Sequence, residues 1–115
     1  MRWIMRSKIH KARVTEANVD YIGSITIDEN LMDMVGLVPG EKVLVVDNTN
    51  GSRLETYTIT GKRGSGEICM NGAAAHLIKE GDEIIIIGFE LTDTPESVKP
   101  KAILVDENNQ FIRYL

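Results

Sequence analysis

The chain has little of the two residue types that build disulfides and most metal sites. It contains one cysteine, Cys69, and two histidines, His10 and His76. A single cysteine cannot form an internal disulfide, and this set offers no Cys/His cluster at the spacing of metal ligands. The sequence therefore predicts neither a disulfide framework nor a metal site. Cys69 lies in a strand-like run and is interpreted as a small apolar core residue.

Long apolar runs are also missing. In 115 residues, of which 43% are hydrophobic and 26% charged, no window approaches the roughly 18 consecutive apolar residues of a membrane helix. The first residues carry charge from Arg2 onward and contain no apolar stretch of signal-peptide length. We therefore expect one compact, soluble domain over residues 1–115, with a cytoplasmic location.

An excess of positive charge is absent as well. The 13 Lys and Arg residues stand against 17 Asp and Glu, which gives a net charge of −4 and a pI of about 5.1. The basic residues are scattered rather than gathered in a stripe, which argues against nucleic acid as a partner. A protein of this charge that binds an anionic small molecule must place a few cations locally, in a pocket.

What the chain does contain is a series of short strand-like segments. Asn48 to Gly51 lie between two of them, which is a strong hairpin signal. Many short strands in one domain must close or stack to hide their edges. The predicted fold class is therefore mainly β, a small closed barrel of six or seven strands. Strands are predicted over residues 5–17, 24–27, 43–46 and 53–59, around Cys69, and over 83–87, 102–105 and 111–114.

Two short helices are predicted to cap this barrel. Asp28 fits as the N-cap of a helix that buries Leu31 to Val35 and ends at Gly36. The alanine-rich residues 73–78 have helix propensity until the next glycine. Residues 92–99 hold one proline and precede another, and they are interpreted as an exposed connector.

Alternation along residues 5–17 predicts which side chains share a face of that strand. Because successive side chains of a strand point to opposite faces, Lys8 and His10 should point the same way. The same period predicts that Ala12 and Val14 lie on the face of Lys8 and His10. Two potential ligand-binding side chains are thus expected side by side on one surface.

Two other segments carry contrasting patterns. In residues 53–59 the side chains of Arg53 and Tyr57 fall on one face, four residues apart, and could line one cavity. Residues 83–87 are apolar without alternation, which predicts a strand buried on both faces.

The dipeptide Gly23-Ser24 is of chemical interest because it can be a bond that the protein cuts in itself. A serine hydroxyl can attack the preceding carbonyl only if the backbone bends toward it, and glycine tolerates such a bend. The same dipeptide is also an ordinary turn that leads into a strand. From the dipeptide alone, both interpretations stay open.

Six motifs in order resemble one family, the pyruvoyl-dependent aspartate 1-decarboxylases, over nearly the whole chain. The resemblance implies a double-psi β-barrel assembled as a homotetramer. It also implies a precursor that cleaves itself into residues 1–23, the β chain, and 24–115, the α chain. The motifs are Met5 with Lys8-Ile9-His10, Val14-Thr15-Glu16-Ala17, Tyr21-Ile22-Gly23-Ser24 with Ile27-Asp28, Asn50-Gly51-Ser52-Arg53 with Thr56-Tyr57, Arg63-Gly64-Ser65, and Asn71-Gly72-Ala73-Ala74-Ala75-His76.

The resemblance further implies an activity, which is decarboxylation of L-aspartate to β-alanine and carbon dioxide for pantothenate and coenzyme A biosynthesis. A covalent pyruvoyl group made from Ser24 would form a Schiff base with the substrate, and Tyr57 would donate the proton. Cleavage would involve Gly23, Ser24 and Thr56. The implied substrate-binding residues are Lys8, Arg53, Thr56, Gly72, Ala73 and Ala74, with His10, Tyr21 and Asn71 behind them.

Ordinary structural roles remain open beside these. Tyr57 can be a packing residue, Arg53 a solvated charge, and residues 71–74 a tight strand-to-helix connection rather than a backbone anion site. Which carboxylate of aspartate Lys8 and Arg53 would each bind also stays open. The second functional hypothesis is a β-barrel binding or interaction module in which Gly23-Ser24 is never cut. One departure from some family members is that residues 46–48 lack a tryptophan.

Overall fold

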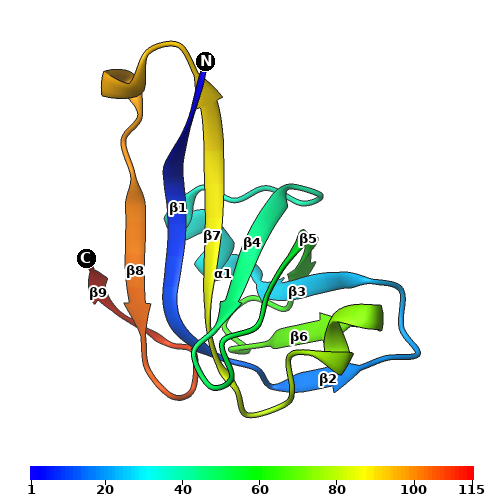
Figure 1. Ribbon diagram of the computed structural model, residues 1–115. Coiled ribbons are helices and arrows are strands. Elements are labelled where there is room, and N and C mark those ends of the chain that lie inside the picture. The colour runs from blue at the N-terminus through cyan, green and yellow to red at the C-terminus, as the bar shows by residue number, and fades with distance from the viewer.

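The computed structural model describes all 115 residues, and strands dominate it (Figure 1). No helix is long and apolar enough to cross a bilayer. Nine strands, one α-helix and two 3₁₀ helices follow one another along the chain. They are β1 (Arg2–Arg13), β2 (Glu16–Asn18), β3 (Ser24–Asp28), α1 (Glu29–Val35), β4 (Lys42–Asp47), β5 (Arg53–Gly61), β6 (Ile68–Asn71), η1 (Gly72–His76), β7 (Glu83–Thr92), η2 (Pro95–Ser97), β8 (Lys101–Val105) and β9 (Phe111–Tyr114).

The strands form one sheet in the order β2-β6-β3-β5-β4-β7-β1-β8-β9. Only Val14 and Thr15 separate β1 from β2, and the Thr15 backbone N–H donates to the Ile68 carbonyl at the start of β6, 2.8 Å away. The chain itself thus joins β1, near one end of this strand order, to β2 at the other end. Counted as one bent strand, β1 and β2 complete a ring of six with β6, β3, β5, β4 and β7, and β8 and β9 lie outside it.

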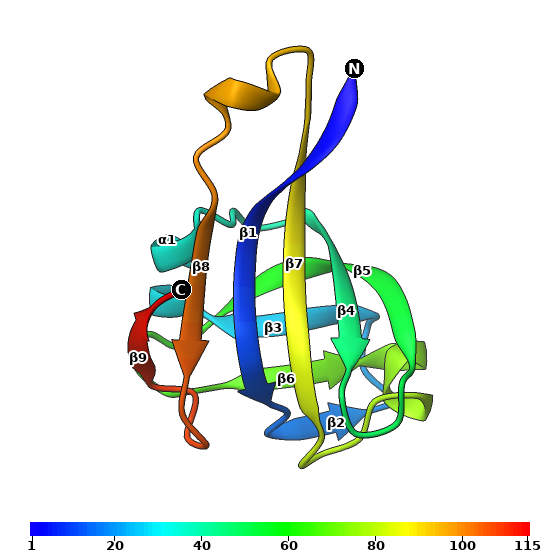
Figure 2. The ribbon, with the colours of Figure 1, turned by 60° about the vertical axis from the view of Figure 1, so that its left-hand side comes forward.

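Three strand pairs, β1–β8, β2–β6 and β3–β5, are parallel, and the others are antiparallel. Parallel neighbours require crossing connections. Figure 2 shows β8, β1, β7 and β4 running side by side, with β3, β6 and β2 crossing behind them. A cluster of 18 buried hydrophobic side chains fills the space between these layers. The predicted mainly-β fold class is confirmed, and the crossed layers are compatible with a double-psi barrel.

The long strand predicted over residues 5–17 is divided and irregular. Lys11 has a φ of 62°, and the pairing of β1 with β7 shifts at this point. Such a β-bulge reverses the side-chain alternation beyond it. Lys8 and His10 share the outer face as predicted, but Ala12 and Val14 are buried in the core. The prediction that all four share one face is therefore wrong, because alternation alone does not reveal a bulge.

The predicted helix α1 is confirmed with both of its caps. The Asp28 carboxylate accepts a hydrogen bond from the Asn30 N–H at 2.9 Å, and Gly36 follows the last helical residue. The same carboxylate also accepts from the N–H groups of Gly64, at 3.0 Å, and Gly66, at 2.9 Å. Asp28 is thus more than a helix cap, because it also ties α1 to the loop between β5 and β6.

Both predicted hairpins are present. β4 and β5 pair antiparallel around the Asn48–Gly51 turn, and β8 and β9 pair antiparallel around residues 106–110. β7 differs from its prediction because it alternates. Ile84 and Ile86 are fully buried in the core, whereas Ile85 and Ile87 are half-buried on the outer face. The four isoleucines therefore make a strand with two apolar faces, one of which lies on the surface of this chain.

Beyond the barrel, the start of β1 and the end of β7 form a two-stranded arm beside η2 and the exposed connector 92–99 (Figures 1 and 2). The arm carries exposed apolar side chains, with Trp3 69% and Leu91 43% accessible. Large apolar groups gathered on one projecting element are typical of a surface that another molecule covers.

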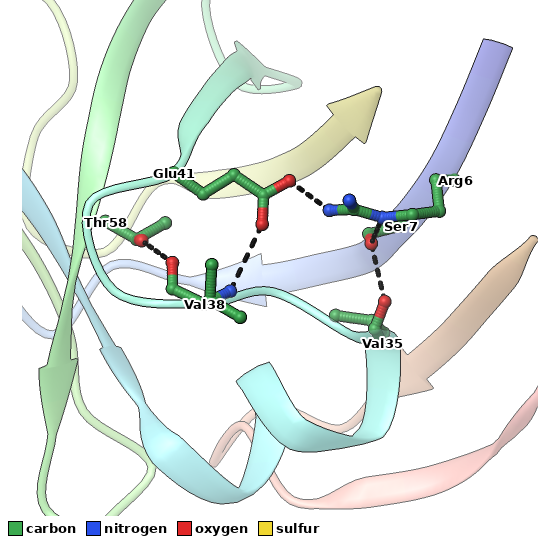
Figure 3. A network of polar contacts seen from close by, with 6 residues as sticks. All are labelled: Arg6, Ser7, Val35, Val38, Glu41 and Thr58. Carbon is green, nitrogen blue, oxygen red and sulfur yellow. Dashed lines mark hydrogen bonds and ion pairs between the residues drawn. The ribbon is translucent and has the colours of Figure 1, made fainter. Parts of the chain in front are cut away.

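A polar network ties the loop before β4 to β1 and β5 (Figure 3). Arg6 forms an ion pair with Glu41, whose carboxylate also accepts from the Val38 N–H at 3.1 Å. The Thr58 hydroxyl donates to the Val38 carbonyl at 2.8 Å, and the Ser7 hydroxyl donates to the last carbonyl of α1 at 2.5 Å. The loop is therefore fixed on both sides, and the buried hydroxyls of Ser7 and Thr58 gain hydrogen-bond partners.

Candidate active site

Ser24 is the first residue of β3, and its side chain is 1% exposed. It lies opposite Asn71, the last residue of β6. The Asn71 amide Nδ2 donates to the Ser24 Oγ at 2.9 Å, and the Ser24 hydroxyl donates to the Ile22 carbonyl at 3.4 Å. A buried hydroxyl next to Gly23 is thus held from two sides.

Gly72 packs its backbone directly on the Gly23 backbone. Gly72 has a φ of 72°, which L-residues with side chains rarely adopt. A Cβ on Gly72 would lie 2.7 Å from the Gly23 Cα, 2.9 Å from the Gly23 nitrogen and 3.0 Å from the Tyr21 carbonyl oxygen. Glycine is therefore required at position 72 for this approach, which presses the two backbones together beside the expected scissile bond.

Gly72 is the first residue of η1, a 3₁₀ helix of five residues that ends at His76, two residues before the end of the helix predicted over residues 73–78. The Asn71 side chain makes no capping bond to η1, and its Nδ2 donates to the hydroxyls of Ser24 and Thr26. No residue separates β6 from η1, so the strand-to-helix connection is tight.

A cavity of about 290 Å³ lies over this region. It brings together Gly23 and four other sequence-predicted residues from three elements. Leu54, Glu55 and Leu77 complete its wall and were not predicted as site residues, although Glu55 stands between Arg53 and Tyr57 in the same alternating strand. The lining residues are Gly23, Leu54, Glu55, Thr56, Asn71, Ala73, Ala74 and Leu77.

Strand β5 lies alongside the Gly23-Ser24 segment. β3 pairs with β5 in parallel register, Ile25 opposite Thr58. Continued backward, this register places Ser24 beside Tyr57 and Gly23 beside Thr56. Tyr57 is 41% exposed on the outer face, which the exposed Arg53 shares, as the alternation predicted. The Ser24 side chain lies on this face too, because Ile25 and Ile27 point into the core.

Lys8 lies elsewhere on the barrel. It pairs with Ile87 of β7, which pairs with Leu44 of β4, which pairs with Glu55 of β5. Three strand spacings of about 4.8 Å therefore place the Lys8 backbone about 14 Å from that of Glu55. One chain alone does not bring Lys8 to the cavity beside Gly23.

His10 is close to Lys8 on the same face and, like Lys8, is separated from β5 by β7 and β4. Its Nδ1 atom is buried without a hydrogen-bond partner. Burial lowers the pKa of His10, and the positive charges of Lys8 and Lys11 lower it further. The imidazole is therefore neutral at neutral pH, and its Nδ1 atom is buried without a hydrogen bond.

Tyr21 lines a second, more polar cavity of about 340 Å³, together with Thr26, Glu67, Cys69 and Asn71. Asn71 thus borders both cavities. Burial raises the pKa of the Cys69 thiol to about 12. This thiol stays protonated at neutral pH, which does not suit a nucleophile. No group of three or more His, Cys, Asp and Glu side chains is arranged to hold a metal ion.

Among solved structures, a crystal structure of the computationally designed msDPBB_sym2 protein aligns with this chain at a TM-score of 0.47 and 18% identity. The alignment covers 76% of this chain and 99% of the designed one.

Relatives by sequence cover almost the full chain. Aspartate 1-decarboxylase of Bacillus subtilis (strain 168) is 53% identical over 116 residues, and that of Bacillus cereus (strain B4264) is 55% identical over 116 residues. Each alignment covers 99% of this chain and 91% of the relative. The aspartate 1-decarboxylase of Acetivibrio thermocellus is 58% identical over 111 residues, which are 95% of this chain and 88% of the relative. A family model described as aspartate decarboxylase matches residues 1–112. The chain therefore belongs to the aspartate decarboxylase family.

Proposed function

We propose that this chain decarboxylates L-aspartate to β-alanine after cutting itself between Gly23 and Ser24. Membership of the aspartate decarboxylase family supports the reaction. The observation that carries the proposed cut is the buried Ser24 hydroxyl, held by Asn71 beside a Gly23 backbone that Gly72 presses into place. The proposal includes a pyruvoyl cofactor derived from Ser24 and the cytoplasmic location expected from the sequence.

The cut is an exchange of one bond for another within the chain. The Ser24 Oγ attacks the Gly23 carbonyl carbon, the C–N bond breaks, and the Ser24 nitrogen becomes a free amine while Gly23 becomes an ester. Loss of the Ser24 Cα proton and of the ester oxygen from Cβ then releases the Gly23 carboxylate and leaves dehydroalanine. One water converts this residue into a pyruvoyl group and ammonia. The beginning of residues 24–115 thus becomes the cofactor.

The neighbours of Ser24 suit such a group. The Asn71 amide is a hydrogen-bond donor already directed at the Ser24 side chain, and Thr56 lies beside Gly23, where its hydroxyl can hold the carbonyl during the cut. A pyruvoyl group supplies the electron sink that decarboxylation needs and that no ordinary side chain offers. The small side chains of Ala73 and Ala74 leave room for substrate in the cavity.

In this proposal two residues of β5 act on the substrate, one as a proton donor and one as a carboxylate-binding group. Tyr57 lies on the next strand to Ser24 and on the same face, from which its hydroxyl can deliver a proton to the former α-carbon of the substrate. The Arg53 guanidinium, on the same face, is the group best suited to bind a carboxylate through two hydrogen bonds.

The position of Lys8 supports an oligomer, which we propose to be a homotetramer. Lys8 and His10 are separated from β5 by two strands, so in this proposal they complete the site of a neighbouring copy. The outer face of β7 and β4, between Lys8 and β5, is apolar, with half-buried Leu44, Ile85 and Ile87. A face of this kind, continued by the exposed side chains of the arm, is what a subunit interface covers.

The test is intact-mass spectrometry of the purified protein combined with an aspartate decarboxylation assay. We expect two fragments, residues 1–23 and 24–115, with the second lacking a free amino terminus, and release of carbon dioxide and β-alanine from L-aspartate. A single full-length mass after prolonged incubation, without aspartate turnover, would instead support the uncleaved binding module.

Two variants separate the cut from the decarboxylation. Ser24→Ala removes the nucleophile, so it should abolish both cleavage and activity. Tyr57→Phe keeps Ser24 and its contacts, so it should still be cleaved but decarboxylate at least about a hundredfold more slowly, the typical loss for a missing general acid. Unchanged turnover in Tyr57→Phe would assign the proton to another donor.

A further inference from the structure

Thr26 is joined to the proposed cleavage site through a single amide group. The Asn71 Nδ2 donates to the Ser24 Oγ at 2.9 Å and to the Thr26 Oγ1 at 3.0 Å. Ser24 and Thr26 are two residues apart on β3, so their side chains lie on the same face. Asn71 lies opposite Ser24 on β6. One amide therefore bridges two hydroxyl groups.

An amide NH₂ group has two hydrogens, and this geometry occupies both. The bond to Thr26 fixes the plane of the Asn71 amide, and the second hydrogen is then directed at Ser24. Without the Thr26 hydroxyl, one hydrogen would lose its partner, and the amide would be free to turn. The polar cavity of about 340 Å³, which both Asn71 and Thr26 line, gives it space to do so.

The bond to Ser24 matters for the direction of attack. The Asn71 donor occupies one lone pair of the Ser24 Oγ, and the Ser24 proton points to the Ile22 carbonyl. These two contacts hold the oxygen beside the preceding peptide. No charged side chain hydrogen-bonds to Ser24, so its placement depends on these neutral contacts.

We propose that Thr26 is a positioning residue for self-cleavage, acting by holding the Asn71 amide against the Ser24 hydroxyl. Thr26 does not contact the scissile carbonyl in this role. The inference rests on the proposed cut at Gly23-Ser24 and adds a residue to it. Because a typical hydrogen bond contributes about 1 kcal/mol, loss of the Thr26 hydroxyl should slow cleavage about fivefold.

The test compares two matched pairs of full-length chains that differ in the hydroxyl at position 26. The first pair is the unchanged chain and Thr26→Val, which have side chains of nearly the same shape. The second pair is Thr26→Ser and Thr26→Ala, which keeps the comparison valid if valine disturbs folding. Freshly isolated precursor is incubated at one temperature, and the fraction cut after residue 23 is followed by intact mass. The hydroxyl-bearing chain of each pair should be cleaved about fivefold faster.

Thr60→Val is the control, because Thr60 lines the same cavity but makes no side-chain hydrogen bond to Asn71. It should be cleaved at the rate of the unchanged chain. Equal cleavage rates within the two pairs would overturn the role of Thr26, and so would an equal loss of rate in Thr60→Val. If the unchanged chain is never cut, the proposed function fails first and this inference fails with it.

Discussion

At Gly72 the backbone conformation and the space around it both exclude a side chain. Gly72→Ala forces a Cβ into the Gly23 backbone at a φ of 72°, so the chain must shift where the proposed cut occurs. We expect a loss of stability of about 1–3 kcal/mol and strongly slowed cleavage. Thermal unfolding and intact mass measure the two effects.

Gly51→Ala is the matched control for this change. Gly51 has a φ of 79°, but a Cβ there would meet no atom within 4 Å. It should therefore carry similar backbone strain without disturbing Gly23, and it should be cleaved normally. Equal cleavage in the two variants would show that contact between Gly72 and Gly23 has no part in the reaction.

The burial of the Asp47 carboxyl predicts that the stability of the protein depends on pH. Its side chain is 1% exposed, and burial raises its pKa, helped by the nearby carboxyl of Asp82. Well below pH 3.8, the ordinary pKa of an aspartate, the carboxyl is protonated in both the unfolded and the folded chain. As the pH rises through the raised folded pKa, the buried group must ionise, and the free energy of unfolding falls.

Asp47→Asn should remove this loss. Asparagine keeps an oxygen that can accept from the Thr49 N–H, now 2.7 Å away, but it carries no charge. The variant should unfold at a higher temperature than the unchanged chain at pH 7, and the gain should shrink as the pH is lowered toward 3.8. A gain that is the same at every pH would contradict this explanation. Asp106→Asn, a less buried carboxyl that also accepts two backbone N–H bonds, is the control.

Single residues were predictable from sequence only where a local pattern identifies them. The alternation of β5 correctly placed Arg53 and Tyr57 on one face. Thr26 was missed, because its importance comes from Asn71, which is 45 residues away in the chain. A polar side chain two residues after Ser24 in a strand is the only local sign of that contact.

At the scale of elements, we expect the ion pair that fixes the loop before β4 to contribute more to stability than an exposed ion pair does. Glu41→Ala would leave the half-buried Arg6 without its ion-pair partner and remove a hydrogen bond from the exposed Val38 N–H. We expect a loss of stability of about 1–3 kcal/mol, measured by denaturant unfolding. Glu55→Ala removes an ion pair with Lys42 in which both side chains are more than half exposed, and its loss should stay within about 1 kcal/mol. Equal losses would show that burial does not decide the contribution of these pairs.

Elements with strong local signals were predicted well, and those shaped by distant contacts were not. The cap residues of α1 and the Asn-Gly turn of the β4–β5 hairpin mark their elements directly in the sequence. The bulge at Lys11 lies in the pairing of β1 with β7, a strand far away in the chain, so no local pattern reveals it. The eight predicted strand segments correspond to nine strands, because β1 and β2 read as one continuous run in the sequence.

At the scale of the whole molecule, the distance between Lys8 and β5 predicts complementation between two inactive variants. Lys8→Ala and Tyr57→Phe should each lose most activity. When they are co-expressed and assemble at random, about a quarter of the sites that take Lys8 from one chain and Tyr57 from its neighbour are intact. Decarboxylation should recover to about that fraction of the unchanged level. Recovery no greater than the sum of the two single variants would place both residues in one chain's site.

The passage of β1 into β2 has a consequence for the protein after the proposed cut. Residues 1–23 contribute β1 to pairings with β7 and β8, and β2 to its pairing with β6. Ile9, Ala12 and Val14 belong to the core, so a segment released from its covalent link stays in place through burial and strand pairing alone. The cut would turn a one-chain barrel into a heterodimer whose smaller member is a peptide. Its unfolding then becomes a dissociation, and refolding from denaturant depends on protein concentration, whereas the uncut precursor refolds as a single chain.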